Sequence, residues 1–112
     1  MASQPTPQPA ARPTAPDPVQ VDPKHYTVEV ENEKVRVLRI KYGPREKSVM
    51  HGHPNSVAVF LTDANFRFTL PDGKTEEPKA TAGEIMWAPA GEHLPENLSD
   101  SGFEAILIEV KG

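Results

Sequence analysis

Short segments that alternate apolar and polar residues, separated by turn residues, are the feature that most constrains the fold of this chain. Residues two apart in a strand point to the same face of a sheet, so a half-buried strand alternates in this way. No segment shows the 3.6-residue apolar period of an amphipathic helix. The segments expected as strands are residues 26–30, 35–40, 56–62, 65–70, 74–79, 84–88, 93–98 and 103–110. This spacing predicts an all-β sandwich or barrel.

The prolines divide the chain into two parts. Seven of the 13 prolines lie within residues 1–24, and the other six are scattered singly through residues 25–112. We therefore expect a disordered Pro-rich tail over residues 1–24 and one folded domain over residues 25–112. Pro13 and Pro16 in the tail have the P-x-x-P spacing that docks on aromatic grooves, although a solvated spacer is the commoner role of such a stretch.

Composition excludes several classes of protein. There is no cysteine, so disulfides and thiolate metal sites are ruled out. The net charge is −4 with no basic block, which argues against nucleic-acid binding. No apolar run approaches the ~20 residues of a membrane span. The N-terminus lacks the basic and apolar regions of a signal peptide, so the cytoplasm is the default expectation, while a trimmed start leaves a secreted or periplasmic protein open.

Small size favours self-association. A domain of this length buries only about 60–65% of the surface that its unfolded chain exposes. A second copy that covers further apolar surface would stabilise the fold. A homodimer is therefore expected.

Three of the four histidines stand where one divalent metal ion can use them. His51 and His53 form an H-x-H pair, and side chains two apart on a strand can aim at one point. His93, on a distant strand, would close one face of a coordination shell. Imidazole suits zinc, copper, iron and nickel. Taken alone, the H-x-H pair is equally compatible with a surface loop that carries two histidines by chance.

Two motifs resemble those of the cupins, small β-barrels of the jelly-roll type. The second cupin motif has a glycine, five residues, P-x-G, one or two residues, a histidine, three residues and an asparagine. This chain matches it at Gly83, Pro89, Gly91, His93 and Asn97. The first motif has a glycine, about five residues and H-x-H, and here Gly43 precedes His51 and His53 by a longer gap of seven residues.

The resemblance implies a jelly-roll (cupin) β-barrel over residues 25–112. It also implies that His51, His53 and His93 bind a divalent transition metal ion, which is iron, manganese, nickel, copper or zinc. The glutamate ligand of the family would fall at Val57 or Ala58, and neither side chain binds metal. Some cupins hold iron with three histidines and no carboxylate. The missing carboxylate raises the net charge of the site by one and leaves coordination positions for water, oxygen or an anionic substrate.

Four residues are candidates for the pocket wall. If the strand after His53 runs straight, Val57, Val59 and Leu61 share the face of the H-x-H pair and form an apolar wall. Such a wall suits a small, partly apolar ligand with a polar head on the metal. Trp87 is either a core or dimer contact or a platform for the ligand.

Other residues of the motifs are expected to support the architecture. Glycine allows tight corners, proline presets φ in a turn, and an asparagine side chain ties neighbouring backbone. These roles fall to Gly83, Pro89, Gly91 and Asn97. Solvated positions are expected for His25, Glu92 and Glu96.

Three functions are compatible with this sequence. The first is a metal-dependent enzyme that acts on a small organic molecule by dioxygenation, isomerisation or lyase chemistry. The second is a non-catalytic module that binds a small molecule or a metal. The third, a barrel whose site is unused, ranks last because all three histidines are present.

Overall fold

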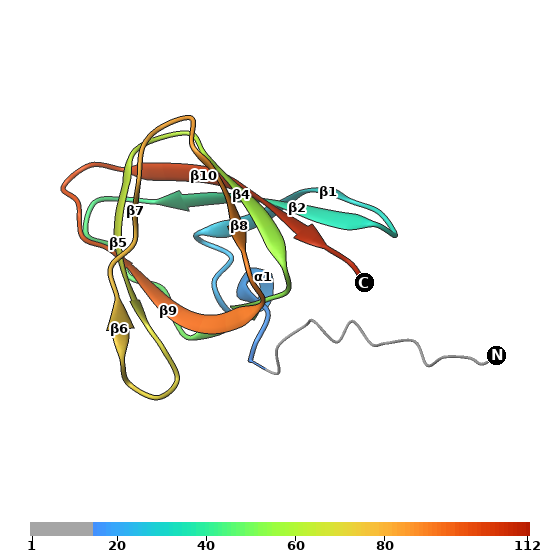
Figure 1. Cartoon of the computed structure of the whole chain (residues 1–112), viewed down its shortest axis with the longest axis horizontal. Coiled ribbons are helices and arrows are strands. Elements are labelled where there is room, and N and C mark those ends of the chain that lie inside the picture. The colour runs from blue at the N-terminus through green and yellow to red at the C-terminus, as the bar shows by residue number, and fades with distance from the viewer. Residues whose placement is uncertain (1–14) are drawn as a thin grey trace.

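Two facing antiparallel sheets form a β-barrel of the jelly-roll type (Figure 1). The structure, a computed structural model, describes residues 15–112. The first sheet has the order β1-β2-β10-β4-β8, with β1 at Tyr26–Glu31, β2 at Val35–Tyr42, β10 at Phe103–Val110, β4 at Ser56–Phe60 and β8 at Ile85–Ala88. The second has the order β3-β9-β5-β6, with β3 at His51–His53, β9 at Gly91–Asn97, β5 at Ala64–Thr69 and β6 at Thr75–Glu76; β7 at Lys79–Ala80 also pairs with β5. The predicted all-β fold is confirmed.

The core lies between the sheets and is built by alternation. On β10, Phe103, Ala105 and Leu107 are buried, while the residues between them are partly exposed. They pack against Leu38 of β2 and Phe66 of β5. Since β10 lies in the middle of the first sheet, its inward side chains meet partners from both sheets, and burial alternates along Phe103–Glu109.

Two predicted strands differ from the observed ones at prolines. The segment 74–79 splits into β6 and β7, separated by Glu77 and Pro78, because proline cannot donate to a ladder. The segment 93–98 is confirmed as β9, although it begins at Gly91. Pro95 lies opposite Phe68 in the β5–β9 ladder, and its carbonyl oxygen accepts a hydrogen bond from the Ser48 N–H (2.9 Å).

The predicted boundary of the tail at residue 24 is wrong. Residues 15–24 pack on the barrel and include the short helix α1 at Pro18–Val21, whose first residue is buried. The Arg36 guanidinium donates to both carboxylate oxygens of Asp17 (2.8 and 2.9 Å), and the Gly52 N–H donates to the Pro16 carbonyl (3.0 Å). These polar contacts, which apolar patterning does not reveal, hold the segment in place. Residues 1–14 lie outside the described part of the chain, and Pro13 of the P-x-x-P spacing lies among them.

Two of the motif residues, Gly83 and Asn97, shape the backbone around them. Gly83 has a φ of +90°, which a residue with a side chain rarely adopts. The Asn97 amide donates to the carbonyls of Gly43 and Ser101 (both 3.0 Å), and its oxygen accepts from the Ser99 N–H (3.0 Å). No helix within residues 15–112 is long and apolar enough to cross a membrane.

Candidate metal centre

Two neighbouring strands bring the three predicted histidines together. His51 lies directly opposite His93 in the β3–β9 ladder, and His53 is two residues further along β3 on the same face. The ring centroids lie 4.8 to 5.3 Å apart, and one ligand atom from each ring lies within 4.8 Å of the others. Among residues 15–112, this is the one group of three or more side chains that could hold a metal ion.

Hydrogen bonds on the far side of two rings set their tautomers. His51 Nδ1 lies 2.8 Å from the Val49 carbonyl oxygen, and His53 Nδ1 lies 3.0 Å from Glu109 Oε2. Both oxygens are acceptors, so each Nδ1 carries the proton and each Nε2 keeps a lone pair. This arrangement, with the outer ring nitrogen held by an oxygen, is typical of histidines that bind metal.

The inner nitrogens fit a shared cation. His51 Nε2 and His53 Nε2 lie 3.1 Å apart, close to the ~3.0–3.4 Å expected for two imidazoles that each bind one ion at about 2.1 Å. His93 Nε2 is buried and has no hydrogen-bond partner. Because buried polar atoms are normally satisfied, this nitrogen indicates a ligand that the protein itself does not supply. The donor set therefore fits a divalent transition metal.

The environment keeps His51 and His93 neutral. Burial, together with the neighbouring His53, lowers the pKa of His51 to about 4. Burial and the two other rings lower the pKa of His93 well below its ordinary value. Neutral imidazole is the form that binds metal, so neither ring has to lose a proton at neutral pH.

A buried carboxylate orients His53, and sequence reasoning missed it. Glu109 of β10 is fully buried, and its second oxygen accepts from Arg36 Nε (2.8 Å). Burial alone raises the pKa of Glu109, but the hydrogen bonds from His53 and Arg36 outweigh it and hold the pKa below its ordinary value. The signal was present in the sequence, because Glu109 follows Phe103, Ala105 and Leu107 at the inward positions of the last strand.

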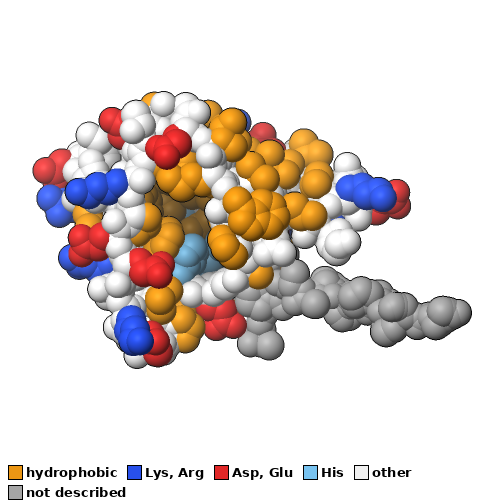
Figure 2. Space-filling view, viewed as in Figure 1, with side chains coloured by type: hydrophobic (Ala, Val, Ile, Leu, Met, Phe, Trp, Pro, Cys, Tyr) orange, Lys and Arg blue, Asp and Glu red, His pale blue; other side chains and the backbone are white. Residues whose placement is uncertain are grey.

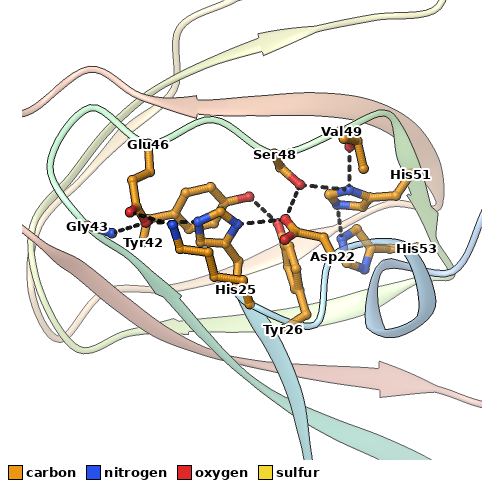
Figure 3. A network of polar contacts seen from close by, with 11 residues as sticks. Asp22, His25, Tyr26, Tyr42, Gly43, Glu46, Ser48, Val49, His51 and His53 are labelled. Carbon is orange, nitrogen blue, oxygen red and sulfur yellow. Dashed lines mark hydrogen bonds and ion pairs between the residues drawn. The ribbon is translucent and has the colours of Figure 1, made fainter.

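A second polar network lies beside His51 (Figure 3). His25, expected at the surface, is 5% exposed, so that prediction is wrong. Its Nδ1 lies 2.7 Å from an Asp22 oxygen, and its Nε2 lies 2.9 Å from a Glu46 oxygen. The Ser48 hydroxyl donates to Asp22 and lies 3.5 Å from His51 Nδ1. The network fixes the segment that precedes β3 and thereby the direction from which His51 enters the cluster.

An apolar cavity of about 470 Å³ opens onto the cluster. Figure 2 shows the hollow with histidine at its base and apolar side chains around it. Phe66 and Phe68 line it, and the centroid of the Phe68 ring lies 4.3 Å from that of His93. Its polar and charged lining residues include Ser56, Glu76, Lys79 and Glu92.

The residues predicted to form the apolar wall do not line the cavity, because the prediction chose the wrong face of β4. The inward residues of β4 are Ser56, Ala58 and Phe60, which line the cavity, whereas Val57, Val59 and Leu61 are not part of its lining. The expectation required a straight strand after His53. Pro54 and Asn55 instead connect β3 of one sheet to β4 of the other, so the face alternation is not carried across.

Two further expectations concern the mouth of the cavity. Trp87 lines it while remaining 58% exposed, which places this ring at the rim. Glu92, expected at the solvated surface, also lines the cavity and accepts a hydrogen bond from the Ala15 N–H (3.2 Å). Glu96 lies near Arg67 (3.9 Å) at a partly exposed position outside the cavity lining.

Solved structures with the same architecture identify the family. The sequence matches no protein-family model and no curated protein. The structure is similar to a cupin domain protein from Bordetella pertussis, with a TM-score of 0.72 and 30% identity over 78% of this chain and 92% of that one. The chain belongs to the cupin superfamily.

More distant cupins share the fold alone. A cupin family protein from Methanocaldococcus jannaschii has a TM-score of 0.59 at 22% identity, over 80% of this chain and 84% of that one. An oxalate decarboxylase has a TM-score of 0.58 at 17% identity, and the match covers 78% of this chain and 26% of that protein. The cupin fold and its three-histidine group together fit a metal-binding cupin.

Proposed function

We propose that this cupin is a metal-dependent enzyme that acts on a small organic anion with an apolar body. The observation that carries the proposal is the position of the histidine cluster, with its buried and unpartnered His93 Nε2, at the base of an apolar cavity. His51, His53 and His93 would hold the metal. Of the metals named above, the donor set does not select one.

The charge of the site favours an anionic head on the ligand. Three neutral imidazoles leave the charge of a divalent ion undiminished, and Val57 and Ala58 stand where cupins commonly place a carboxylate ligand. Glu109 contributes its negative charge one hydrogen bond further out, through His53. A carboxylate or enolate on the ligand would supply the charge that the protein does not place directly on the metal.

The walls favour an apolar body. Phe60, Phe66, Phe68 and Phe103 line the cavity, and its volume of about 470 Å³ lies within the range of small-molecule sites. These side chains exclude water and orient the ligand with its head toward the histidines. Glu76 and Glu92 line the same cavity, and either carboxylate would hold or move a proton there.

A divalent transition metal in this position supplies Lewis-acid polarisation of a carbonyl or enolate oxygen, or oxygen chemistry. Of dioxygenation, isomerisation and lyase reactions, dioxygenation requires the fewest acids and bases from the protein. It therefore best suits a wall made largely of phenylalanine and small apolar side chains.

Metal analysis tests the site, and turnover tests the enzyme. Purified protein reconstituted with iron, manganese, nickel, copper or zinc should bind one ion per chain, and His51→Ala and His93→Ala should abolish binding. Oxygen uptake and product formation are then measured with a panel of keto-acids, diketones and oxalate. Stoichiometric metal without turnover would favour the alternative, a non-catalytic cupin that binds a small molecule. No bound metal after reconstitution would contradict the metal-dependent enzyme and favour the third possibility, a barrel whose site is unused.

A further inference from the structure

We propose that residues 15–24 form a clasp whose docking on the barrel is coupled to metal binding by the three histidines. This coupling presupposes the metal site proposed above. Hydrogen bonds join this one segment, which we call the N-terminal clasp, to the surroundings of all three rings. Asp17 and Asp22 of the clasp would act on the metal through other side chains, so they are positioning residues rather than ligands.

The clasp covers the edge of β3, the strand that carries two of the histidines. β3 is the end strand of its sheet, with β9 on one side, and α1 of the clasp packs against it. Gly52 lies between His51 and His53 and is buried. Its N–H donates to the Pro16 carbonyl (3.0 Å), a partner that the N–H loses when the clasp leaves the barrel. The docked clasp therefore fixes the backbone between two of the ligands.

A chain of charged side chains joins the clasp to His53. The Arg36 guanidinium donates to both oxygens of Asp17 (2.8 and 2.9 Å), and its Nε donates to Glu109 (2.8 Å). Glu109 in turn accepts from His53 Nδ1 (3.0 Å). The side chains of Arg36 and Glu109 are 9% and 1% exposed, so undocking of Asp17 would leave a buried guanidinium short of two hydrogen bonds. The position of Asp17 is therefore transmitted to the His53 ring.

A second path joins the clasp to His51. Asp22 ends α1, where its N–H donates to the Pro18 carbonyl (2.8 Å), and its side chain is buried. The Ser48 hydroxyl donates to this carboxylate and lies 3.5 Å from His51 Nδ1. Figure 3 shows these contacts as one continuous path from Asp22 through Ser48 to His51. Docking of α1 thus places the carboxylate that holds Ser48 against the ring.

The start of the clasp reaches the strand of the third histidine. The Ala15 N–H donates to Glu92 Oε2 (3.2 Å). Glu92 directly precedes His93 and lies opposite Gly52 in the β3–β9 ladder. Ala15 and its neighbour Pro16 therefore hold both strands of this ladder at the level of the histidines.

The clasp can leave the barrel without separating the sheets. Its apolar anchors are Pro18, which is buried, and Val19, which packs against the core. A short segment with few apolar contacts opens more readily than the core strands. Since the docked clasp presets the ligands, metal binds the docked form more tightly, and by linkage the metal stabilises docking by the same factor. Couplings of this kind are typically about 5- to 150-fold.

The first measurement is the affinity of the full-length protein for Zn²⁺, which is redox-inert and binds imidazole. Val19→Ser weakens docking without touching any of the polar links, because the Val19 side chain contacts the core alone among these groups. Asp17→Asn weakens the link to Arg36. Each variant should bind Zn²⁺ at least about fivefold more weakly than the wild type. Val21→Ser, the same substitution at a 42% exposed position of α1, is the matched control and should bind as the wild type does.

The second measurement needs no substitution. Within the clasp, the N–H groups of Val21 and Asp22 donate to the carbonyls of Asp17 and Pro18. Saturating Zn²⁺ should slow hydrogen exchange of these amides at least about fivefold. The Asn32 amide, which is bonded to the Val35 carbonyl in the β1–β2 turn, is the control and should exchange at an unchanged rate. A clasp with a merely structural role would not respond to the metal.

Circular dichroism verifies that each variant keeps the barrel. Wild-type Zn²⁺ affinity in both Val19→Ser and Asp17→Asn, or clasp amides whose exchange Zn²⁺ leaves unchanged, would overturn the coupling while the metal site stands. An equal loss of affinity in Val21→Ser would overturn it too, because docking would then not be the cause. A wild-type protein that binds no Zn²⁺ would overturn the metal site itself and the coupling with it.

Discussion

Replacing Glu109 with glutamine tests how the protein prepares His53 for metal. The carboxylate is fully buried, accepts from His53 Nδ1 (3.0 Å) and accepts from Arg36 Nε (2.8 Å). A glutamine has one accepting oxygen and one donating amide in nearly the same shape. It can satisfy His53 or Arg36, but it presents a donor to the other.

Glu109→Gln should therefore lower both the metal affinity and the stability of the protein. An outer carboxylate on a metal-binding histidine typically contributes 10- to 100-fold in affinity, or about 1.4–2.8 kcal/mol. A hydrogen bond that involves a charged group contributes about 1.5–3 kcal/mol to stability, and Arg36 keeps its pairing with Asp17. For a domain of this size, a destabilisation of about 2 kcal/mol lowers Tm by roughly 8–16 °C.

The assay compares Glu109→Gln with a matched control on the same strand. Glu104 is also paired with an arginine, Arg39, but it is about one-third exposed and does not touch the histidines. Glu104→Gln should change stability by less than about 1 kcal/mol and leave metal affinity unchanged. Metal affinity is measured by calorimetric titration with the metal found in the reconstituted protein. Stability is measured by thermal unfolding of the metal-free protein. Wild-type metal affinity in Glu109→Gln would refute the role assigned to the carboxylate.

Three further predictions concern separate parts of the fold. The folded pKa of His51 of about 4 lies below its ordinary value of 6.5, so its contribution to stability is complete above pH 6.5 and is lost as the pH falls toward 4. The Tm of the metal-free protein should drop over that window, and less steeply in His51→Gln. Asp17→Asn keeps the helix cap but removes the charge that pairs with Arg36, and should cost about 1–2 kcal/mol in urea unfolding. Asn97→Ala leaves two carbonyls and one N–H without their partner and should cost about 2–4 kcal/mol, with metal affinity measured by titration unchanged.

Much of the fold was readable from the sequence because short apolar segments separated by turn residues mark the strands, and along β10 burial alternates as the pleat requires. Phe103, Ala105 and Leu107 alternate with partly exposed residues and are buried between the sheets. The histidine cluster was predictable for the same reason, because an H-x-H pair on β3 faces one way and β9 lies directly beside it.

The misplaced residues have physical causes. Val57 was assigned to the face of His53 by counting alternate residues along one unbroken strand. The chain instead passes from one sheet to the other at Pro54 and Asn55. His25 is buried because Asp22 and Glu46 satisfy both of its ring nitrogens, and one of these partners lies 21 residues away. Hydrogen bonds of this kind allow burial of a polar residue that hydropathy alone assigns to the surface.

In the proposed metal site, Glu109 lies behind His53 and so differs from the glutamate ligand that the first motif lacks. A carboxylate bound directly to the metal would cancel part of its charge and occupy a coordination position. Placed behind His53, it holds the ring in the required tautomer and leaves both the position and the charge available to the ligand. The Arg36 and Asp17 side chains extend this arrangement to the N-terminal segment, so the segment expected to be a disordered tail helps to hold Glu109 in place.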